Sequence, residues 1–434
     1  MKCIVKFLLL CFIVLLNCKQ ANRNTKDSDN REKLKAKCLN SRISNHLSEF
    51  KYSDYIDRQF ENFLKKWSMT GMSVAIVKDE RLVYAHGFGY ADREKAIEIT
   101  PGHVFRLASI SKLITAVAII KLVENGKLSL DSKVFGENAI LNDSIFYNPK
   151  DNRLKDITIR HLLAHSGGWS QRYGDPAFNS LSIAEKVGDT PPATICSYCK
   201  FVAGRNLHFT PGTSSSYSNM GYMFLGEVIS KITGRPYDEY IRHEILIPNG
   251  IYDMHVGNSL ESGRLENEVK YYEQEDSPLI PGFDGSNQLV PKVYGGNPIE
   301  LLGPAGGWLA SSVELARLLV LIDGNNLVKD IIPHRLLHEM VCRERTRGPL
   351  GWLRVLPDGD WWRTGSMAGT SAMMKRCKNG IGWVVLFNSS SWKGTLFANE
   401  INSIMTKVIG HVKTWPDHDL FDYYPPEYVL SVEK

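Results

Sequence analysis

The sequence predicts a mixed α/β (α+β) fold, and three observations carry this prediction. An amphipathic helix and two short strands are expected within residues 46–89. Apolar patterns of helical spacing dominate the middle of the chain, from about residue 106 to residue 322. Short strands separated by tight turns return in residues 351–388. Strands, then helices, then strands is an order typical of the α+β class.

The composition is that of an ordinary globular protein. The chain has 434 residues, of which 43% are hydrophobic and 23% are charged, so a sizeable core can form. The net charge is only +5, and no block of Lys and Arg alternates with aromatic residues. We therefore expect no nucleic-acid partner.

Residues 1–18 are predicted to be an export signal. Basic residues precede the apolar run from Phe7 to Leu16, which is too short to span a bilayer comfortably. The segment ending at Cys18 resembles a bacterial lipoprotein cleavage site, except that Asn17 replaces the usual small residue. Cys18 is thus a lipidation candidate, and a plain signal-peptidase cut is the alternative. Either route predicts an exported protein of the periplasm or cell envelope.

Residues 19–45 are polar enough to predict a flexible tether. The folded domain is expected at residues 46–412, with a sheet lobe at 46–105 and 345–412, a helical lobe at 106–344, and a tail at 413–434. The eight cysteines include a Cys196/Cys199 pair, and the absence of a second C-x-x-C disfavours zinc. We expect that pair to be structural or unpaired, and Cys342 with Cys377 is a candidate disulfide.

The individual elements follow from periodicity and from residues that begin or end them. Apolar residues at three- and four-residue spacings predict a helix from His46 to Trp67. Further helices are expected at Leu113–Val123, Gly221–Thr233, Val313–Ile322 and Thr395–His411, the fourth with its N-cap at Ser311 or Ser312. Strands are expected at Met72–Val77, Leu82–Gly89, Gly351–Leu356, Trp361–Thr364, Thr370–Lys375 and Ile381–Asn388. Residues 258–304 are expected to form long loops over a cleft.

A short helix capped by Thr158 contains His161 and His165, four positions apart. Such spacing can bind a metal, but HExxH is absent and no carboxylate nearby completes a ligand set, so packing or hydrogen bonding is the expected role. The following Ser166 stands in a sequence similar to a nucleophile elbow. That motif requires a preceding strand, whereas a helix is predicted here, so Ser166 is disfavoured as the nucleophile.

Ser109 and Lys112 are the strongest candidate catalytic pair. The S-x-x-K pattern occurs five times and is not informative alone. Ser109, however, lies where a helix that is apolar on all sides begins, so its N–H faces the positive end of the helix dipole. Lys112 follows one turn later on the same face, and its burial would be costly without a function. A buried lysine has a lowered pKa and can activate a neighbouring hydroxyl.

Two more motifs follow in the chain. Tyr217 and Asn219 belong to its one Y-x-N sequence, in which a phenol beside a lysine loses its proton more easily. A buried loop tyrosine is the alternative interpretation. Arg363, Thr364, Gly365 and Ser366 lie on a predicted strand, where the glycine permits close approach of substrate, the Ser366 N–H can bind an oxyanion, and the cation can hold an anionic group.

The order S-x-x-K, Y-x-N, basic-T-G resembles that of the penicillin-recognising serine hydrolases, nearest to the class C β-lactamase-related branch with its D-alanyl-D-alanine carboxypeptidases, D-aminopeptidases and esterases. The resemblance covers residues 46–411, including Ile159–Gly168 and Pro304–Gly307. It implies a five-stranded antiparallel sheet flanked by helices, shared by the N-terminal hairpin and the C-terminal meander, with a mainly helical lobe inserted.

The resemblance also implies roles for the site residues. Ser109 would form the acyl-enzyme with help from Lys112, Tyr217 would act as general base and acid, and the N–H groups of Ser109 and Ser366 would form the oxyanion hole. Asn219 would orient the substrate and Lys112. Arg363 replaces the usual Lys or His. It preserves carboxylate binding but cannot relay a proton near neutral pH, which disfavours efficient β-lactam hydrolysis.

We therefore expect an exported serine hydrolase that acts on an ester, an amide or a D-amino-acid peptide, without a cofactor or metal. A fragment of the cell wall is one candidate substrate. A binding or scaffold protein of the same fold, with little or no turnover, is the main alternative. An α/β-hydrolase that uses Ser166 is the third. The substrate, the oligomeric state and the lipidation of Cys18 do not follow from the sequence.

Overall fold

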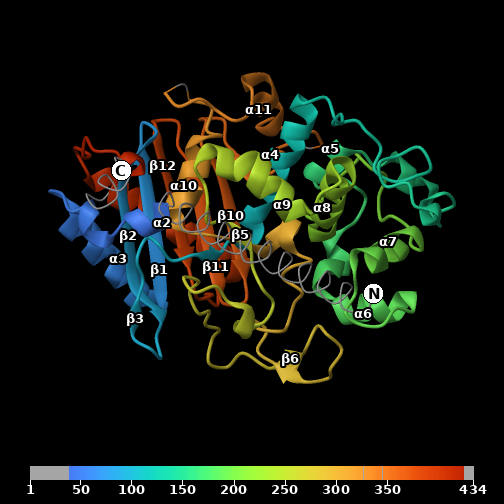
Figure 1. Ribbon diagram of the computed structural model, residues 1–434, viewed down its shortest axis with the longest axis horizontal. Coiled ribbons are helices and arrows are strands. Elements are labelled where there is room, and N and C mark those ends of the chain that lie inside the picture. Colours follow the sequence, from blue (N-terminus) through green and yellow to red (C-terminus); the bar gives the residue numbers. More distant parts are fainter. Residues whose placement is uncertain (1–38, 326, 345, 425–434) are drawn as a thin grey trace, which may run out of the picture.

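The structure, a computed structural model, describes residues 39–325, 327–344 and 346–424 (Figure 1). The predicted export signal, the lipidation candidate Cys18 and most of the predicted tether lie outside these residues. Within the described part, no helix has both the length and the apolar composition needed to cross a membrane.

A seven-stranded sheet, in the order β3-β2-β1-β12-β11-β10-β9, forms one side of the molecule. Its strands are β1 (Gly71–Lys78), β2 (Arg81–Asp92), β3 (Ile97–Glu98), β9 (Arg354–Val355), β10 (Trp361–Met367), β11 (Thr370–Arg376) and β12 (Ile381–Phe387). The predicted number of five strands is therefore corrected to seven. The five central strands are long, whereas the edge strands β3 and β9 have two residues each.

The N-terminal hairpin and the C-terminal meander meet in the middle of this sheet. β1 pairs antiparallel with β12, for example at Val74 and Val385, and also with β2. The prediction that the N-terminal hairpin and the C-terminal meander share one sheet is thus confirmed. This pairing brings residues that are about three hundred positions apart into direct contact.

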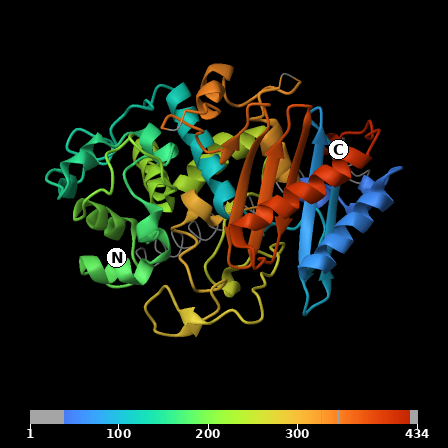
Figure 2. The same cartoon turned by 180° about the vertical axis from the view of Figure 1, so that it is seen from behind.

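Helices cover both faces of the sheet. Alternate side chains of each strand point to opposite faces, and both are apolar here. The outer face packs against α3 (Ser53–Trp67) and α12 (Phe397–His411), which lie in front of the strands in Figure 2. The inner face packs against α10 (Ser312–Val320) and, further from the sheet, against α4 (Ser111–Glu124).

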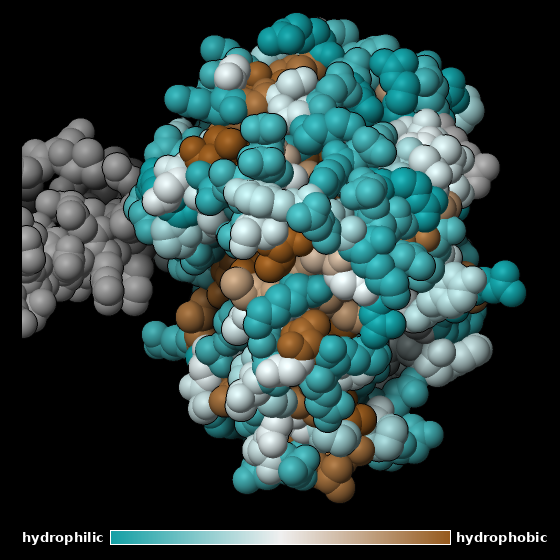
Figure 3. All heavy atoms as spheres, turned by 90° about the vertical axis from the view of Figure 1, so that its right-hand side faces the viewer, coloured by the Kyte–Doolittle hydropathy of each residue, from teal (hydrophilic) through white to brown (hydrophobic). Residues whose placement is uncertain are grey.

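The helical lobe lies beyond the inner face (Figure 1). Its helices are α5 (Ile159–Leu163), α6 (Ser180–Val187), α7 (Ile195–Ala203), α8 (Asn219–Thr233), α9 (Tyr237–Ile241) and α11 (His334–Met340). Small strands accompany them: β4 (Phe105–Arg106), β5 (His255–Val256), β6 (Ile280–Pro281), β7 (Leu289–Val290) and β8 (Trp308–Ala310). Figure 3 views this lobe from its outer side, where hydrophobic atoms gather in a band across a mostly hydrophilic surface.

The folded part extends beyond both predicted domain ends. Residues 39–42 form the helix α2 (Leu39–Arg42), and Leu39 and Ile43 are buried in the main core instead of lying in a tether. In the predicted tail, Leu420 and Phe421 are also buried in that core. These few apolar residues are enough to hold otherwise polar segments against the domain.

One helix within the predicted helical lobe, residues 106–344, lies outside that lobe in the structure. This helix is α10. It packs on β1 and β12 and thus belongs to the sheet lobe. Of the two predicted N-cap residues, Ser311 and Ser312, the structure selects Ser311, whose hydroxyl accepts a hydrogen bond from Glu314 N–H.

The four cysteines of the described part are free thiols. Cys196 is exposed and Cys199 is buried on α7, so this pair is unpaired as expected. The candidate disulfide between Cys342 and Cys377 is wrong for this structure. Cys342 follows α11, whereas Cys377 lies in the turn between β11 and β12, where its N–H bonds to Ile381.

Candidate active site

Ser109 lies on a single 3-10 turn, η2 (Ala108–Ile110), that leads from β4 directly into α4. The preceding residue, Ala108, has φ +45°, an unusual conformation for a residue with a side chain. Local strain of this kind is found where a side chain must be held in one direction. The turn leaves Ser109 partly exposed at the start of α4, as predicted.

Lys112 lies one turn further on and has no exposed surface. Its Nζ donates to Ser109 Oγ at 3.2 Å, to Asn219 Oδ1 at 2.5 Å and to the Ala305 carbonyl at 2.5 Å. These three acceptors match the three N–H groups of an ammonium. The S-x-x-K spacing therefore does place the amine beside the hydroxyl.

Burial lowers the pKa of Lys112 to about 8 from its ordinary value of 10.5. The nearby Tyr217 phenol opposes this shift, whereas the positive charge of Arg363 adds to it. A lysine with a pKa near 8 is partly neutral close to neutral pH, so it can accept a proton from Ser109.

Tyr217 stands between the two cations of the site. Arg363 Nη2 donates to Tyr217 Oη at 2.7 Å, and Lys112 Nζ lies 4.9 Å from the centre of the phenol ring. Burial alone would raise the pKa of Tyr217, but Arg363 and Lys112 outweigh it and the pKa is lowered. A phenol held in this way can exchange a proton with its neighbours.

Arg363 is 1% exposed and bonds to the site itself. Its Nε donates to the Ser109 carbonyl at 2.8 Å, and its Nη2 to Tyr217. Nη1 is buried and is left without a hydrogen-bond partner. The guanidinium thus supports the nucleophile turn and the phenol, and it also lines the cleft, where the predicted contact with an anionic substrate group stays a prediction.

Thr364, Gly365 and Ser366 continue along β10 beside η2. A Cβ atom on Gly365 would lie only 2.1 Å from the Leu107 carbonyl oxygen. Glycine is therefore needed here for the strand to approach the nucleophile turn, a reason different from the predicted approach of substrate. Thr364 and Ser366 line the cleft, as does Gly365.

Three contributors to this site carried no signal by themselves in the sequence. Asp175 Oδ2 accepts from Asn219 Nδ2 at 2.5 Å and so fixes the amide that holds Lys112. The Ala305 carbonyl comes from the turn η10 (Gly303–Gly307). His165 stacks on Tyr217 with ring centres 4.4 Å apart. η10 and His165 could have been suspected, because both lie in segments that are part of the resemblance, whereas Asp175 lies in neither.

The histidines and Ser166 have structural contacts. His161 completes a capping box with Thr158, and His165 Nδ1 accepts from Ser218 N–H, so both pack and form hydrogen bonds as expected. Among the described residues, no group of three His, Cys, Asp or Glu side chains could hold a metal ion. Ser166 is buried after a helix, and its hydroxyl bonds to the His161 carbonyl.

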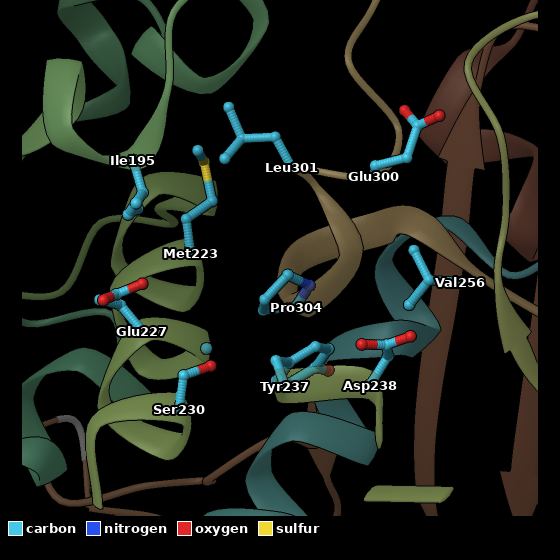
Figure 4. A pocket seen from close by; sticks show the side chains of 11 residues that line it. Ile195, Met223, Glu227, Ser230, Tyr237, Asp238, Val256, Glu300, Leu301 and Pro304 are labelled. Atoms are coloured by element: carbon cyan, nitrogen blue, oxygen red, sulfur yellow. The ribbon is translucent and has the colours of Figure 1, made fainter. Parts of the chain in front are cut away.

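A cleft of about 510 Å³ opens over these residues. Ser109, Tyr217, Asn219 and the 363–366 segment line one part of it, and α12 lines another. A separate hollow of about 340 Å³ contains none of the candidate catalytic residues. In Figure 4, Met223, Leu301 and Pro304 surround that hollow, while the Glu300 carboxylate is turned away from it.

Comparisons with known proteins agree with this geometry. The family profile described as Beta-lactamase matches residues 56–402. The chain is 28% identical over 240 residues to the protein flp of Staphylococcus aureus (strain N315), which is 55% of this chain and 45% of that protein. It therefore spans about half the length of this relative. It is 26% identical over 336 residues to the putative penicillin-binding protein PbpX of Bacillus subtilis (strain 168), covering 77% of this chain and 74% of PbpX.

Among solved structures, the octameric penicillin-binding protein homologue from Pyrococcus abyssi superposes with a TM-score of 0.61 and 26% identity, over 82% of this chain and 77% of that chain. The profile match includes the S-x-x-K, Y-x-N and basic-T-G segments, which the fold brings together around one cleft. The chain therefore belongs to the Beta-lactamase family of serine hydrolases.

Proposed function

We propose that this protein hydrolyses an ester, an amide or a D-amino-acid peptide through an acyl-enzyme at Ser109. The observation that carries the proposal is the fully buried Lys112, whose Nζ bonds to Ser109 Oγ beside a phenol of lowered pKa. Burial of an amine costs stability, so a fully buried lysine in a cleft beside a hydroxyl is a candidate for a functional role.

In the proposed reaction, Ser109 Oγ attacks the substrate carbonyl and loses its proton to the Lys112–Tyr217 pair. The N–H groups of Ser109 and Ser366 stabilise the resulting oxyanion. The tetrahedral intermediate then collapses, and the leaving group takes the proton from Tyr217. A water molecule, deprotonated by the same pair, attacks the carbonyl of the acyl-enzyme ester. The bond to Ser109 Oγ then breaks, the pair returns the proton to Oγ, and the acid product leaves. Since the two groups share the proton, a single base is not assigned.

Labelling of the full chain with a fluorophosphonate, read by intact-protein mass, tests this function. We expect one adduct on the unmodified protein and none on Ser109→Ala, while Ser166→Ala is labelled normally. A stable adduct with a penicillin would point to the peptidase side of the family, and rapid turnover of penicillin to the lactamase side. An unlabelled parent protein would favour the binding or scaffold alternative.

We also propose that residues 1–18 export the protein and that Cys18 carries the lipid anchor. Cell fractionation would locate the parent protein in the envelope. Cys18→Ala is expected to release it from the membrane fraction without blocking export. Parent protein that remains with the cytoplasm would overturn the export proposal.

A further inference from the structure

The cleft continues past Ser109 and around the edge of the sheet. The edge strand β9 pairs only with Trp361 and Trp362 of β10, so the 364–366 segment has no strand on that side within the described part of the chain. The cleft lining includes this open edge together with the first turns of α12. It therefore reaches residues that lie on the other face of the sheet from the nucleophile.

Side chains alternate along β10 between the two faces of the sheet, so they line the cleft on both of those faces. Arg363 and Gly365 point to the inner face, where they contact Ser109 and Leu107. Trp362, Thr364 and Ser366 must then point to the outer face. The cross-strand pairs agree, because Thr364 lies opposite Met373, which belongs to the outer core.

We call the outer part of the cleft the outer groove and define it by Trp362, Ser371, Phe397, Ala398 and Ile401, all of which line the cleft. Phe397 and Ile401 lie one turn apart on α12 and are each 1% exposed. Trp362 and Ala398 pack against the same core and remain partly exposed. The walls of the outer groove are thus apolar and belong to rigid elements.

The Lys375 ammonium next to the outer groove has partners of its own. Lys375, whose Nζ lies 5.5 Å from the centre of the Trp362 ring, bonds to Asp360 at 2.9 Å and to Asn402 at 3.3 Å. No Asp or Glu is among the described residues that line the cleft. A cationic substrate group would therefore find no opposite charge in this cleft, whereas an apolar group would lose water-exposed surface there. The cation that does line the cleft on this side is Arg354, opposite Trp362 on the neighbouring strand.

One polar atom of the outer groove lacks a partner. Ser371 is 4% exposed, and its buried Oγ has no hydrogen bond. Ser371 lies directly opposite Ser366 on the neighbouring strand, so its hydroxyl is on the outer face. A buried hydroxyl without a partner carries a cost that a ligand atom can relieve.

We propose that the outer groove binds an apolar group of the substrate, aromatic or branched aliphatic, that carries a hydrogen-bonding atom for Ser371. This inference rests on the proposed function, since the reacting carbonyl is then at Ser109. Specificity would arise because the apolar group crosses the open edge of β10 and packs against Trp362 and α12.

Two ester series test the proposal with the full chain. One varies the acyl group of 4-nitrophenyl esters from acetyl to butyryl and phenylacetyl, and the other varies the alcohol of acetate esters from methyl to benzyl. We expect kcat/KM to rise with the size of the apolar group in at least one of the two series. Trp362→Ala, which removes a wall, and Ala398→Trp, which fills the outer groove, should each reduce that preference by about tenfold.

Trp392→Ala is the matched control. Trp392 is 74% exposed close to the start of α12 and does not line the cleft, so its removal should leave the preference ratio as it is. Hydrolysis of the acetyl and methyl esters without any preference for larger apolar groups would overturn the proposed role of the outer groove. The same result would support the proposed function. A preference that survives in both Trp362→Ala and Ala398→Trp would also overturn it.

Binding of phenylacetamide separates the two proposals if no ester is hydrolysed. Saturation-transfer NMR is expected to show contact of its ring with the parent protein and a loss of this signal in Ala398→Trp. Such a result would support ligand binding in the outer groove even if the protein hydrolyses no ester. Equal signals from the parent and from Ala398→Trp, or none from the parent, would overturn it.

Discussion

The two faces of the same sheet show opposite uses of burial. On the outer face, β1, β12, α3 and α12 enclose a core of apolar side chains. On the inner face, the cations Lys112 and Arg363 are buried as completely as any core residue. Packing alone explains the outer face, because each apolar side chain lowers the free energy when it leaves water. The inner cations require partners, and they find them at Ser109, Tyr217 and Asn219.

This comparison teaches that burial has to be interpreted together with the partners of each group. Arg106, also buried on the inner side, bonds to the Val293 and Asn258 carbonyls and lies 4.3 Å from the centre of the Tyr271 ring. Its contacts join loops to the domain. Lys112 and Arg363 converge on one hydroxyl and one phenol, so their burial serves the proposed chemistry.

Lys112→Met should have the largest effect, and it tests whether the buried cations of the inner face serve catalysis. Methionine fills similar space but cannot accept the Ser109 proton, so kcat/KM for an ester substrate should fall roughly a thousandfold or more. Steady-state kinetics would measure this. Activity near the parent level would remove Lys112 from the mechanism.

The same variant tests the cost of the buried charge. The lowered pKa of Lys112, about 8 instead of 10.5, means that the folded chain binds fewer protons than the unfolded chain between these pH values. Stability of the parent should therefore rise relative to Lys112→Met from pH 8 to pH 10.5, by roughly 3 kcal/mol in total. Paired denaturant titrations cancel the titration of the other lysines. A constant difference between the two proteins would contradict the lowered pKa.

Tyr217→Phe should have the next largest effect. It keeps the ring that stacks on His165 but removes the hydroxyl that Arg363 holds. We expect the acylation rate to fall roughly a hundredfold, measured by stopped-flow release of 4-nitrophenol. A rate close to that of the parent would exclude Tyr217 as the acid–base group.

Arg363→Gln should lower activity by roughly tenfold and change its pH dependence. Arg363 lowers the pKa of both Tyr217 and Lys112. Without the cation both values rise, so the acidic limb of the kcat/KM profile should move to higher pH. Arg363→Lys restores the charge and should bring the limb back. Unmoved profiles in both variants would assign Arg363 a purely structural role.

Ile76→Ala, in the outer core, should have the smallest effect on activity. Ile76 is fully buried on β1 among apolar neighbours, so its truncation is expected to lower the free energy of unfolding by roughly 2–5 kcal/mol. The kcat/KM of the folded fraction should not change. Loss of activity at temperatures where the variant is fully folded would show that the two faces are coupled.

Much of the fold follows from local patterns in the sequence. The apolar run after Ser109 predicts α4, the alternating segments predict β1, β2, β10, β11 and β12, and Ser311 predicts the start of α10. Errors occur where one or two apolar residues dock a polar segment, as at Leu39 and Leu420, and where edge strands are only two residues long. Such elements depend on the surface that they meet.

The candidate site shows the same division. The sequence by itself determined that Ser109 and Lys112 share a helix turn, because the helical repeat fixes their separation. Only the tertiary structure decided that Arg363 lies beneath Tyr217, that Asp175 holds Asn219, and that α12 adds an apolar wall to the cleft. Those contacts join residues 44 to 146 positions apart along the chain, and the packing of whole elements brings them together.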